Sequence, residues 1–162
     1  MAKVYRNQPV TRLELESLLA LATAEEADFF TRRNPHLIEP YRDRLLCFAL
    51  CQGAALQFLG RGYGVGDFDI HFFYAQNPAK PRLCRKPKHA VSDVGGFNSI
   101  PMDYLRTVVP GATPTTQLES IVVQLQSFLR RRPTSNAFHL SQKAVVGLFP
   151  PGLFGRELWP PL

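Results

Sequence analysis

Features that mark several protein classes are scarce or missing in this chain of 162 residues. No apolar run approaches the roughly 20 residues that a membrane-spanning helix needs, and residues 1–6 lack the apolar stretch of a signal peptide. The three cysteines, Cys47, Cys51 and Cys84, are an odd number without zinc-site partners, which disfavours a disulfide framework or a zinc site. We therefore expect a soluble, cytoplasmic protein without a membrane partner, in which the cysteines are small buried thiols.

Acidic residues are unevenly distributed along the chain. None occurs in residues 70–92, although the whole chain has 13 Asp and Glu against 19 Lys and Arg, for a net charge of +6. The same stretch contains several basic residues: Lys80, Arg82, Arg85, Lys86 and Lys88. Prolines within residues 77–88 predict a loop, which either lies over a binding site and contacts phosphates or is a solvated surface loop. The positive charge suits a nucleotide or a nucleic acid, but no aromatic residues are interleaved to stack single-stranded bases.

The apolar residues that are present indicate both helices and strands. The run 45–51 fits a strand or a helix, and the glycine after it ends the run. The remaining expected elements are helices over 11–22, 25–32, 54–59, 114–130 and 136–148 and strands over 67–73 and 100–109, followed by an irregular tail. The hydrophobic fraction is 45%, and the length suits one domain. We expect a single domain, 1–162, of α/β (α+β) class: a small mixed β-sheet with helices packed mainly on one side, with a core region of about 44–109 and C-terminal helices of about 114–148.

The sequence Asp67-Phe68-Asp69 is the main candidate for chemistry. In a strand, residues two apart project from the same face, so both carboxylates can converge on one hard cation such as Mg²⁺. A third carboxylate, Asp103, lies between apolar residues in another predicted strand. Burying its charge there is costly in free energy unless it has a partner. The alternatives are a turn or solvated edge for Asp67 and Asp69, and a salt bridge to Arg106 for Asp103. The sequence therefore predicts a metal site at Asp67, Asp69 and Asp103, without excluding these structural roles.

A glycine-containing motif precedes the aspartates. Gly53 lets the backbone approach a ligand closely, and the short helix expected after it offers N–H groups to a phosphate. Together with the aspartates, this order resembles the nucleotidyltransferase superfamily typified by the polymerase beta-like fold, as a divergent member. The segments that carry the resemblance are Gln52-Gly53-Ala54, Asp67-Phe68-Asp69-Ile70 and Met102-Asp103-Tyr104. Gln52 stands where the family usually has an apolar residue, and Ala54 where it has Ser or Gly.

The resemblance implies a mechanism. Asp67 and Asp69 would hold one or two Mg²⁺ (or Mn²⁺) ions, and Asp103 would complete the second site and help deprotonate an acceptor hydroxyl. Gly53 and Ala54 would cradle the triphosphate of a nucleoside triphosphate, with Ala54 offering only its backbone N–H. The function expected is a metal-dependent nucleotidyltransferase with an unknown acceptor, for which a nucleic acid is possible. The alternatives are a catalytically silent nucleotidyltransferase-like domain that binds a nucleic acid or a protein partner, and a basic binding domain without metal.

Three further residues have two possible roles each. Lys143, just before an apolar stretch, either reaches back to a phosphate or extends to water. His71 shares the strand parity of Asp67 and Asp69 and should face the same side, although imidazole is a poor ligand for Mg²⁺. His139 is isolated and is interpreted as a surface or structural histidine.

Overall fold

A computed structural model describes residues 7–62, 64–80, 82–83, 88–92 and 100–160. The expectations that lie outside these residues are those for Cys84, Arg85 and Lys86. In the described part of the chain, no helix is long and apolar enough to cross a membrane.

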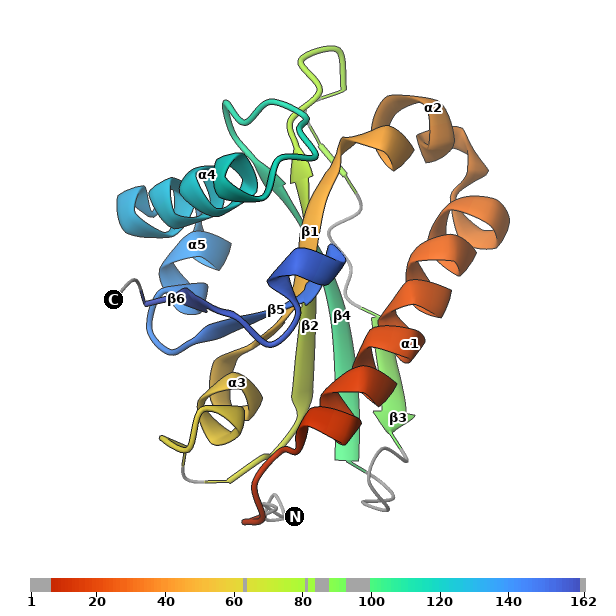
Figure 1. Cartoon of the computed structure of the whole chain (residues 1–162). Helices are drawn as coiled ribbons and strands as arrows, with labels where there is room; N and C mark the ends of the chain where they lie inside the picture. The colour runs from red at the N-terminus through yellow and green to blue at the C-terminus, as the bar shows by residue number, and fades with distance from the viewer. Residues whose placement is uncertain (1–6, 63, 81, 84–87, 93–99, 161–162) are drawn as a thin grey trace.

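Five α-helices and six strands account for most of the described chain (Figure 1). The helices are α1 (Arg12–Asp28), α2 (Ile38–Tyr41), α3 (Gln52–Phe58), α4 (Leu118–Arg131) and α5 (Ser135–Leu140). The strands are β1 (Leu45–Cys51), β2 (Phe68–Ala75), β3 (Lys88–Ser92), β4 (Ile100–Val109), β5 (Val145–Phe149) and β6 (Glu157–Trp159). A π-helical turn (Phe29–Arg33) extends α1, and short 3₁₀ turns cover Pro35–Leu37, Arg42–Arg44 and Pro151–Leu153.

The strands form one mixed sheet in the order β3-β4-β2-β1-β5-β6. Strands β2 and β4 are parallel, and every other neighbouring pair is antiparallel. The parallel register places Asp69 opposite Asp103. Because β1 and β2 are antiparallel neighbours joined through α3, the end of β1 meets the start of β2, and Cys51 lies opposite Asp69. This arrangement brings Gln52 and Gly53, the first residues of α3, to the same end of the sheet as the aspartates.

Each face of the sheet has its own hydrophobic core. Along β1, Phe48 and Leu50 belong to the core beneath α1, whereas Ala49 and Cys51 belong to the core beneath α4 and α5. Figure 1 shows α1 and α4 on opposite sides of the strands. The α/β class and the mixed sheet are thus confirmed, but helices cover both faces and not mainly one. The reason is that β1 and β2 are apolar on both faces, so each face needs a covering layer.

Two helix predictions are wrong. The segments 11–22 and 25–32 form one continuous helix, α1, capped by Thr11 in a capping box and continued by a π-helical turn. No Gly or Pro separates the two segments, so the backbone has no reason to break between them. In the segment 136–148, α5 ends at Leu140, and β5 follows. Val145 and Val146 are buried, β-branched residues that pair with β1. This contact with the sheet favours a strand over a helix for these residues.

Candidate metal centre

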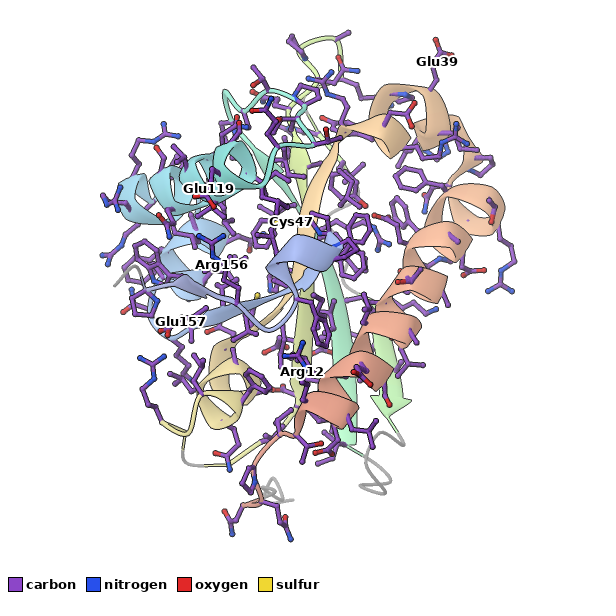
Figure 2. All side chains as sticks on the ribbon, in the orientation of Figure 1. Arg12, Glu39, Cys47, Glu119, Arg156 and Glu157 are labelled. Atoms are coloured by element: carbon purple, nitrogen blue, oxygen red, sulfur yellow. The ribbon has the colours of Figure 1, made fainter. Side chains whose placement is uncertain are left out.

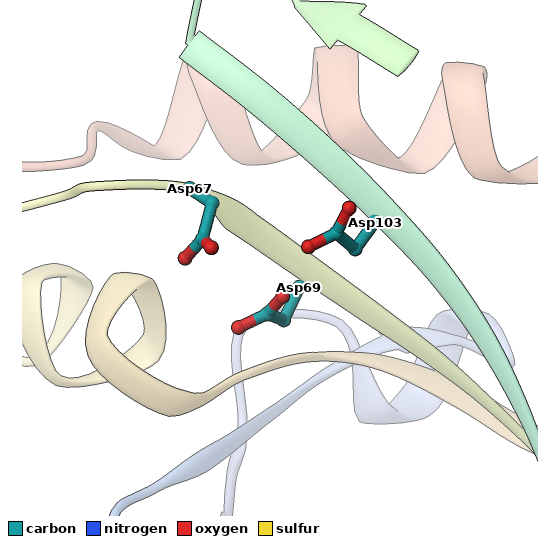
Figure 3. Close-up of side chains that lie close together, drawn as sticks. All are labelled: Asp67, Asp69 and Asp103. Atoms are coloured by element: carbon teal, nitrogen blue, oxygen red, sulfur yellow. The ribbon is translucent and has the colours of Figure 1, made fainter. Parts of the chain in front are cut away.

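The three predicted aspartates lie together. One carboxylate oxygen from each of Asp67, Asp69 and Asp103 can be chosen so that all lie within 4.8 Å of one another, and each residue is partly exposed. Asp69 comes from β2 and Asp103 from the neighbouring strand β4, while Asp67 lies just before β2. Figure 3 shows the three side chains directed towards a common space. The structure thus brings the three predicted carboxylates close to one another.

The edge strand β3 adds a histidine to this group. The Nδ1 atom of His89 lies 2.5 Å from Oδ1 of Asp103, its partner in the register of β3 and β4. The His89 side chain is 73% exposed, so solvent reaches it freely. Strand β3 begins within the predicted loop and has no periodic pattern in the sequence, so His89 is not among the predicted site residues.

His71 lies on the same face, as its strand parity predicts, and lines a small pocket of about 220 Å³ beside Asp69 and Asp103. Burial lowers the pKa of His71 to about 4, although the nearby Asp103 charge acts in the opposite direction. The imidazole is therefore neutral at pH 7. Its Nδ1 atom is buried and has no hydrogen-bond partner among the described residues.

Two of the three cysteines lie in β1, and Cys51 is opposite Asp69. Cys47 and Cys51 are free and buried, as predicted. Burial raises the pKa of Cys51 well above its usual value, and the negative charge of Asp69 raises it further. Both thiols belong to the hydrophobic core beneath α4 and α5. The donor atoms that solvent reaches at this site therefore include the carboxylate oxygens and the imidazole of His89.

A second, larger pocket of about 700 Å³ adjoins the aspartates on the side of α3. Gly53 and Lys143 both line it, together with Asp67 and Asp69. The Nζ atom of Lys143 lies 4.0 Å from the point where a Cβ atom on Gly53 would stand. The structure therefore brings the predicted phosphate-binding residues Gly53 and Lys143 together beside the carboxylates. Ala54 is different, because its side chain is 1% exposed and packs in the core beneath α1.

Gln52 has an unusual backbone at the junction of β1 and α3. Its φ is +65°, in the left-handed region that non-glycine residues seldom adopt. Its N–H donates a hydrogen bond to the carbonyl oxygen of Ala144, 3.0 Å away, which holds this conformation. Gln52 lines both pockets. Backbone strain of this kind concentrates at functional sites, so Gln52 belongs with the site residues even though the sequence marked it only as a departure from the family pattern.

Two basic residues of the predicted loop 77–88 lie apart from the carboxylates. Lys88 begins β3 and pairs with Glu25 of α1 on the other face of the sheet. Arg82 lines a third pocket, near the second half of β4. The structure also corrects the alternative role of Asp103, because Arg106 pairs with Glu25 and Glu26 and not with Asp103. Arg106 and Asp103 differ in strand parity, and their side chains therefore leave opposite faces of β4.

His139 also belongs to this region. It is an exposed residue of α5, as interpreted, but it lines both pockets that contain Asp69. Sequence reasoning could not place it there, because α5 reaches the aspartates only through the fold.

Comparisons of the chain with protein-family models, with curated proteins and with solved structures found no significant match. The resemblance to the nucleotidyltransferase superfamily therefore remains a prediction based on the motifs of the chain itself.

Proposed function

We propose that this protein is a metal-dependent nucleotidyltransferase, which transfers a nucleotidyl group from a nucleoside triphosphate to an acceptor hydroxyl. The observation that carries the proposal is the grouping of Asp67, Asp69 and Asp103 beside Gly53 and Lys143. Carboxylates alone would suit a cation site of any purpose. An adjoining pocket that contains a glycine and a lysine adds a place for phosphates.

The donor set fits Mg²⁺ or Mn²⁺. Both are hard cations that prefer carboxylate oxygens and water, and all three clustered side chains supply oxygen. Three like charges this close repel one another, and a divalent cation relieves that repulsion. When bound, one or two such ions supply Lewis-acid stabilisation of the charge on the phosphates.

The side chains around the aspartates have separate roles in the proposed reaction. Lys143 attracts the triphosphate electrostatically, and Gly53 leaves room for its oxygen atoms. The acceptor hydroxyl oxygen forms a bond to the α-phosphorus, and the bond from that phosphorus to the oxygen of the β-phosphate breaks. Pyrophosphate leaves with the bonding electrons. The hydroxyl proton passes to the Asp103 carboxylate and then to water.

A transfer assay tests the proposal. The protein is incubated with nucleoside triphosphates labelled at the α-phosphate, with Mg²⁺ or Mn²⁺, and with mixed hydroxyl acceptors that include RNA, DNA and small molecules. We expect release of pyrophosphate and transfer of the label, both of which Asp69→Asn and Asp103→Asn should abolish.

Lys80→Gln is the matched control for Lys143→Gln, because both lysines are exposed and only Lys143 lines the pocket. Only Lys143→Gln should weaken the binding of a non-hydrolysable triphosphate in calorimetry. Binding of Mn²⁺ and triphosphate without transfer to any acceptor would favour the catalytically silent domain. If the wild-type protein binds neither, the proposed function is wrong.

A further inference from the structure

The three pockets described above adjoin one another in series, and together they are called the groove. The pocket of Gly53 and the pocket of His71 share Gln52, Asp69 and His139. The pocket of His71 and the pocket of Arg82 share Leu105 and Asn136. Two pockets that share lining residues are neighbours on the surface. The carboxylates therefore lie within a groove that extends from them in two directions.

Helix α5 and the residues next to it form one wall along the whole groove. Thr134, Ser135 and Asn136 line the pocket of Arg82, and Asn136 and His139 line the middle pocket. His139 and the two residues after the helix, Gln142 and Lys143, line the pocket of Gly53. The Asn136 amide donates to the Thr107 hydroxyl over 3.3 Å, which joins this wall to β4 at the centre of the groove.

The arm of the groove near Arg82, of about 690 Å³, has a different composition from the arm of Gly53. Its described lining contains no acidic residue. Its polar lining residues other than the buried, paired Arg106 offer hydroxyl, amide and guanidinium groups: Gln76, Arg82, Thr107, Thr134, Ser135 and Asn136. These are the groups that bind phosphate and sugar oxygens in complexes with nucleic acids.

The surface next to this wall is basic and carries an exposed aromatic ring. Residues 120–156 contain no Asp or Glu, while Arg130, Arg131 and Arg132 are exposed at the end of α4. Phe138 of α5 is 47% exposed, and the guanidinium of Arg132 lies 5.6 Å from the centre of its ring. An aromatic ring beside cations is the arrangement on which unpaired bases stack.

We infer that the acceptor is a single-stranded polynucleotide, whose 3′ end lies along α5 in the arm of Arg82 with its terminal hydroxyl at the carboxylates. This inference rests on the proposed function, which places the triphosphate in the arm of Gly53. A small acceptor needs no second arm that extends beyond the middle pocket. A protein acceptor gains little from a wall of arginine, amide and hydroxyl groups, whereas repeated phosphates do.

Fluorescence anisotropy with labelled single-stranded RNA and DNA oligonucleotides tests the inference. The double variant Arg82→Gln/Phe138→Ala removes one cation and one exposed ring next to the groove. The control Arg156→Gln/Leu13→Ala removes one cation and one exposed apolar side chain elsewhere. Leu13 is 72% exposed on α1, and Arg156 pairs with Glu119 (Figure 2). Thermal melts establish that both variants fold.

We expect the groove variant to weaken oligonucleotide binding by about tenfold at low salt and to reduce the salt dependence by about one charge. The control should change the Kd by less than about twofold. Tighter binding of the RNA or of the DNA oligonucleotide identifies which of the two polynucleotides is the acceptor. Equal effects of the two variants, or no binding by the wild type, would overturn the inference. Transfer to a small acceptor without oligonucleotide binding would overturn it and leave the proposed function standing. If the wild-type protein binds neither Mn²⁺ nor a triphosphate, the proposed function itself is wrong.

Discussion

Strands β2 and β4 carry a charged cluster on each face, and the two clusters differ in their balance of charge. On the face of α4 and α5, Asp67, Asp69 and Asp103 bring three carboxylates together. On the face of α1, Glu25 is 3% exposed and pairs with Arg106 at 2.9 Å and with Lys88 at 3.0 Å. One cluster places three carboxylates close together, and the other pairs a buried carboxylate with two cations.

The cluster beneath α1 is built into the packing. The guanidinium of Arg106 lies 3.6 Å from the ring centre of Phe29 and 4.4 Å from that of Phe72. Glu26 accepts a hydrogen bond from the Tyr74 hydroxyl at 2.5 Å. Burial raises the pKa of Glu26, and the hydrogen bond from Tyr74 and the positive charge of Arg106 oppose that change. These contacts hold α1, β2 and β4 together, so this cluster has a structural role.

The difference in charge balance predicts different roles for the two clusters, one in stability and one in binding. A buried ion pair is costly to break, because removing one partner leaves the other charge without compensation. Carboxylates that lie this close repel one another, and a cation bound between them would relieve that repulsion. The same chemical change, from a carboxylate to an amide, should therefore have opposite effects on the two faces.

The largest effect is expected on the face of α1. Glu25→Gln should lower the free energy of unfolding by about 3–5 kcal/mol, because Arg106 loses its closest carboxylate in a buried site. Urea denaturation measures the change. The control is Arg32→Gln, which breaks an exposed pair with Asp28 on the same helix and should move the midpoint little. A small change in Glu25→Gln would contradict the structural role of this cluster.

A pH effect of slightly smaller size is expected from His71. Burial lowers its folded-state pKa to about 4 from the ordinary 6.5. Between these values the unfolded chain binds a proton that the folded protein does not, so stability falls as the pH drops from 6.5 towards 4. The loss attributable to His71 reaches about 3 kcal/mol at the acid end. Urea denaturation at several pH values should show that His71→Gln removes this part of the slope, and an unchanged slope would show that His71 is not buried as a neutral group.

The next effect concerns the carboxylates themselves. Asp69→Asn should leave the protein without metal at least as stable as the wild type, because one repulsion is relieved. It should also abolish the stabilisation by Mn²⁺, which for the wild type is about 2.7 kcal/mol at a hundred times the Kd. Melting curves of both proteins with and without Mn²⁺ measure this. A variant that melts lower without metal, yet gains as much from Mn²⁺ as the wild type, would rule out a metal site at Asp69.

The smallest effect on stability is expected at Lys143. Because this side chain is exposed, Lys143→Gln should leave the melting temperature of the protein alone unchanged. In the presence of Mn²⁺, a triphosphate should raise the melting temperature of this variant less than that of the wild type. Thermal melts with Mn²⁺, with and without a non-hydrolysable triphosphate, make the measurement. An equal loss in Lys80→Gln would show a general effect of charge and not a contact in the pocket.

Local patterns in the sequence predicted much of the candidate metal centre. The spacing of Asp67 and Asp69 determines that both leave one face of a strand, and the extent of β4, Ile100–Val109, was predicted in full. The strand β3 and its His89 were missed, because five residues without regular alternation carry little information. The end of the segment 136–148 was misassigned, because a short apolar run fits a buried strand as well as a helix.

The sequence by itself determined which residues are candidates for chemistry and on which side of each strand they lie, since side-chain direction along a strand depends only on local backbone geometry. Only the tertiary structure decided which of these residues meet. Strand order and the parallel register of β2 with β4 place Asp103 opposite Asp69. The docking of α5 brings His139 and Asn136 to the groove. Arg106 lies on the opposite face of β4, where it pairs with Glu25 and not with Asp103. These pairings depend on contacts between residues far apart in the chain, which follow from the packing of two complete cores and not from any local pattern.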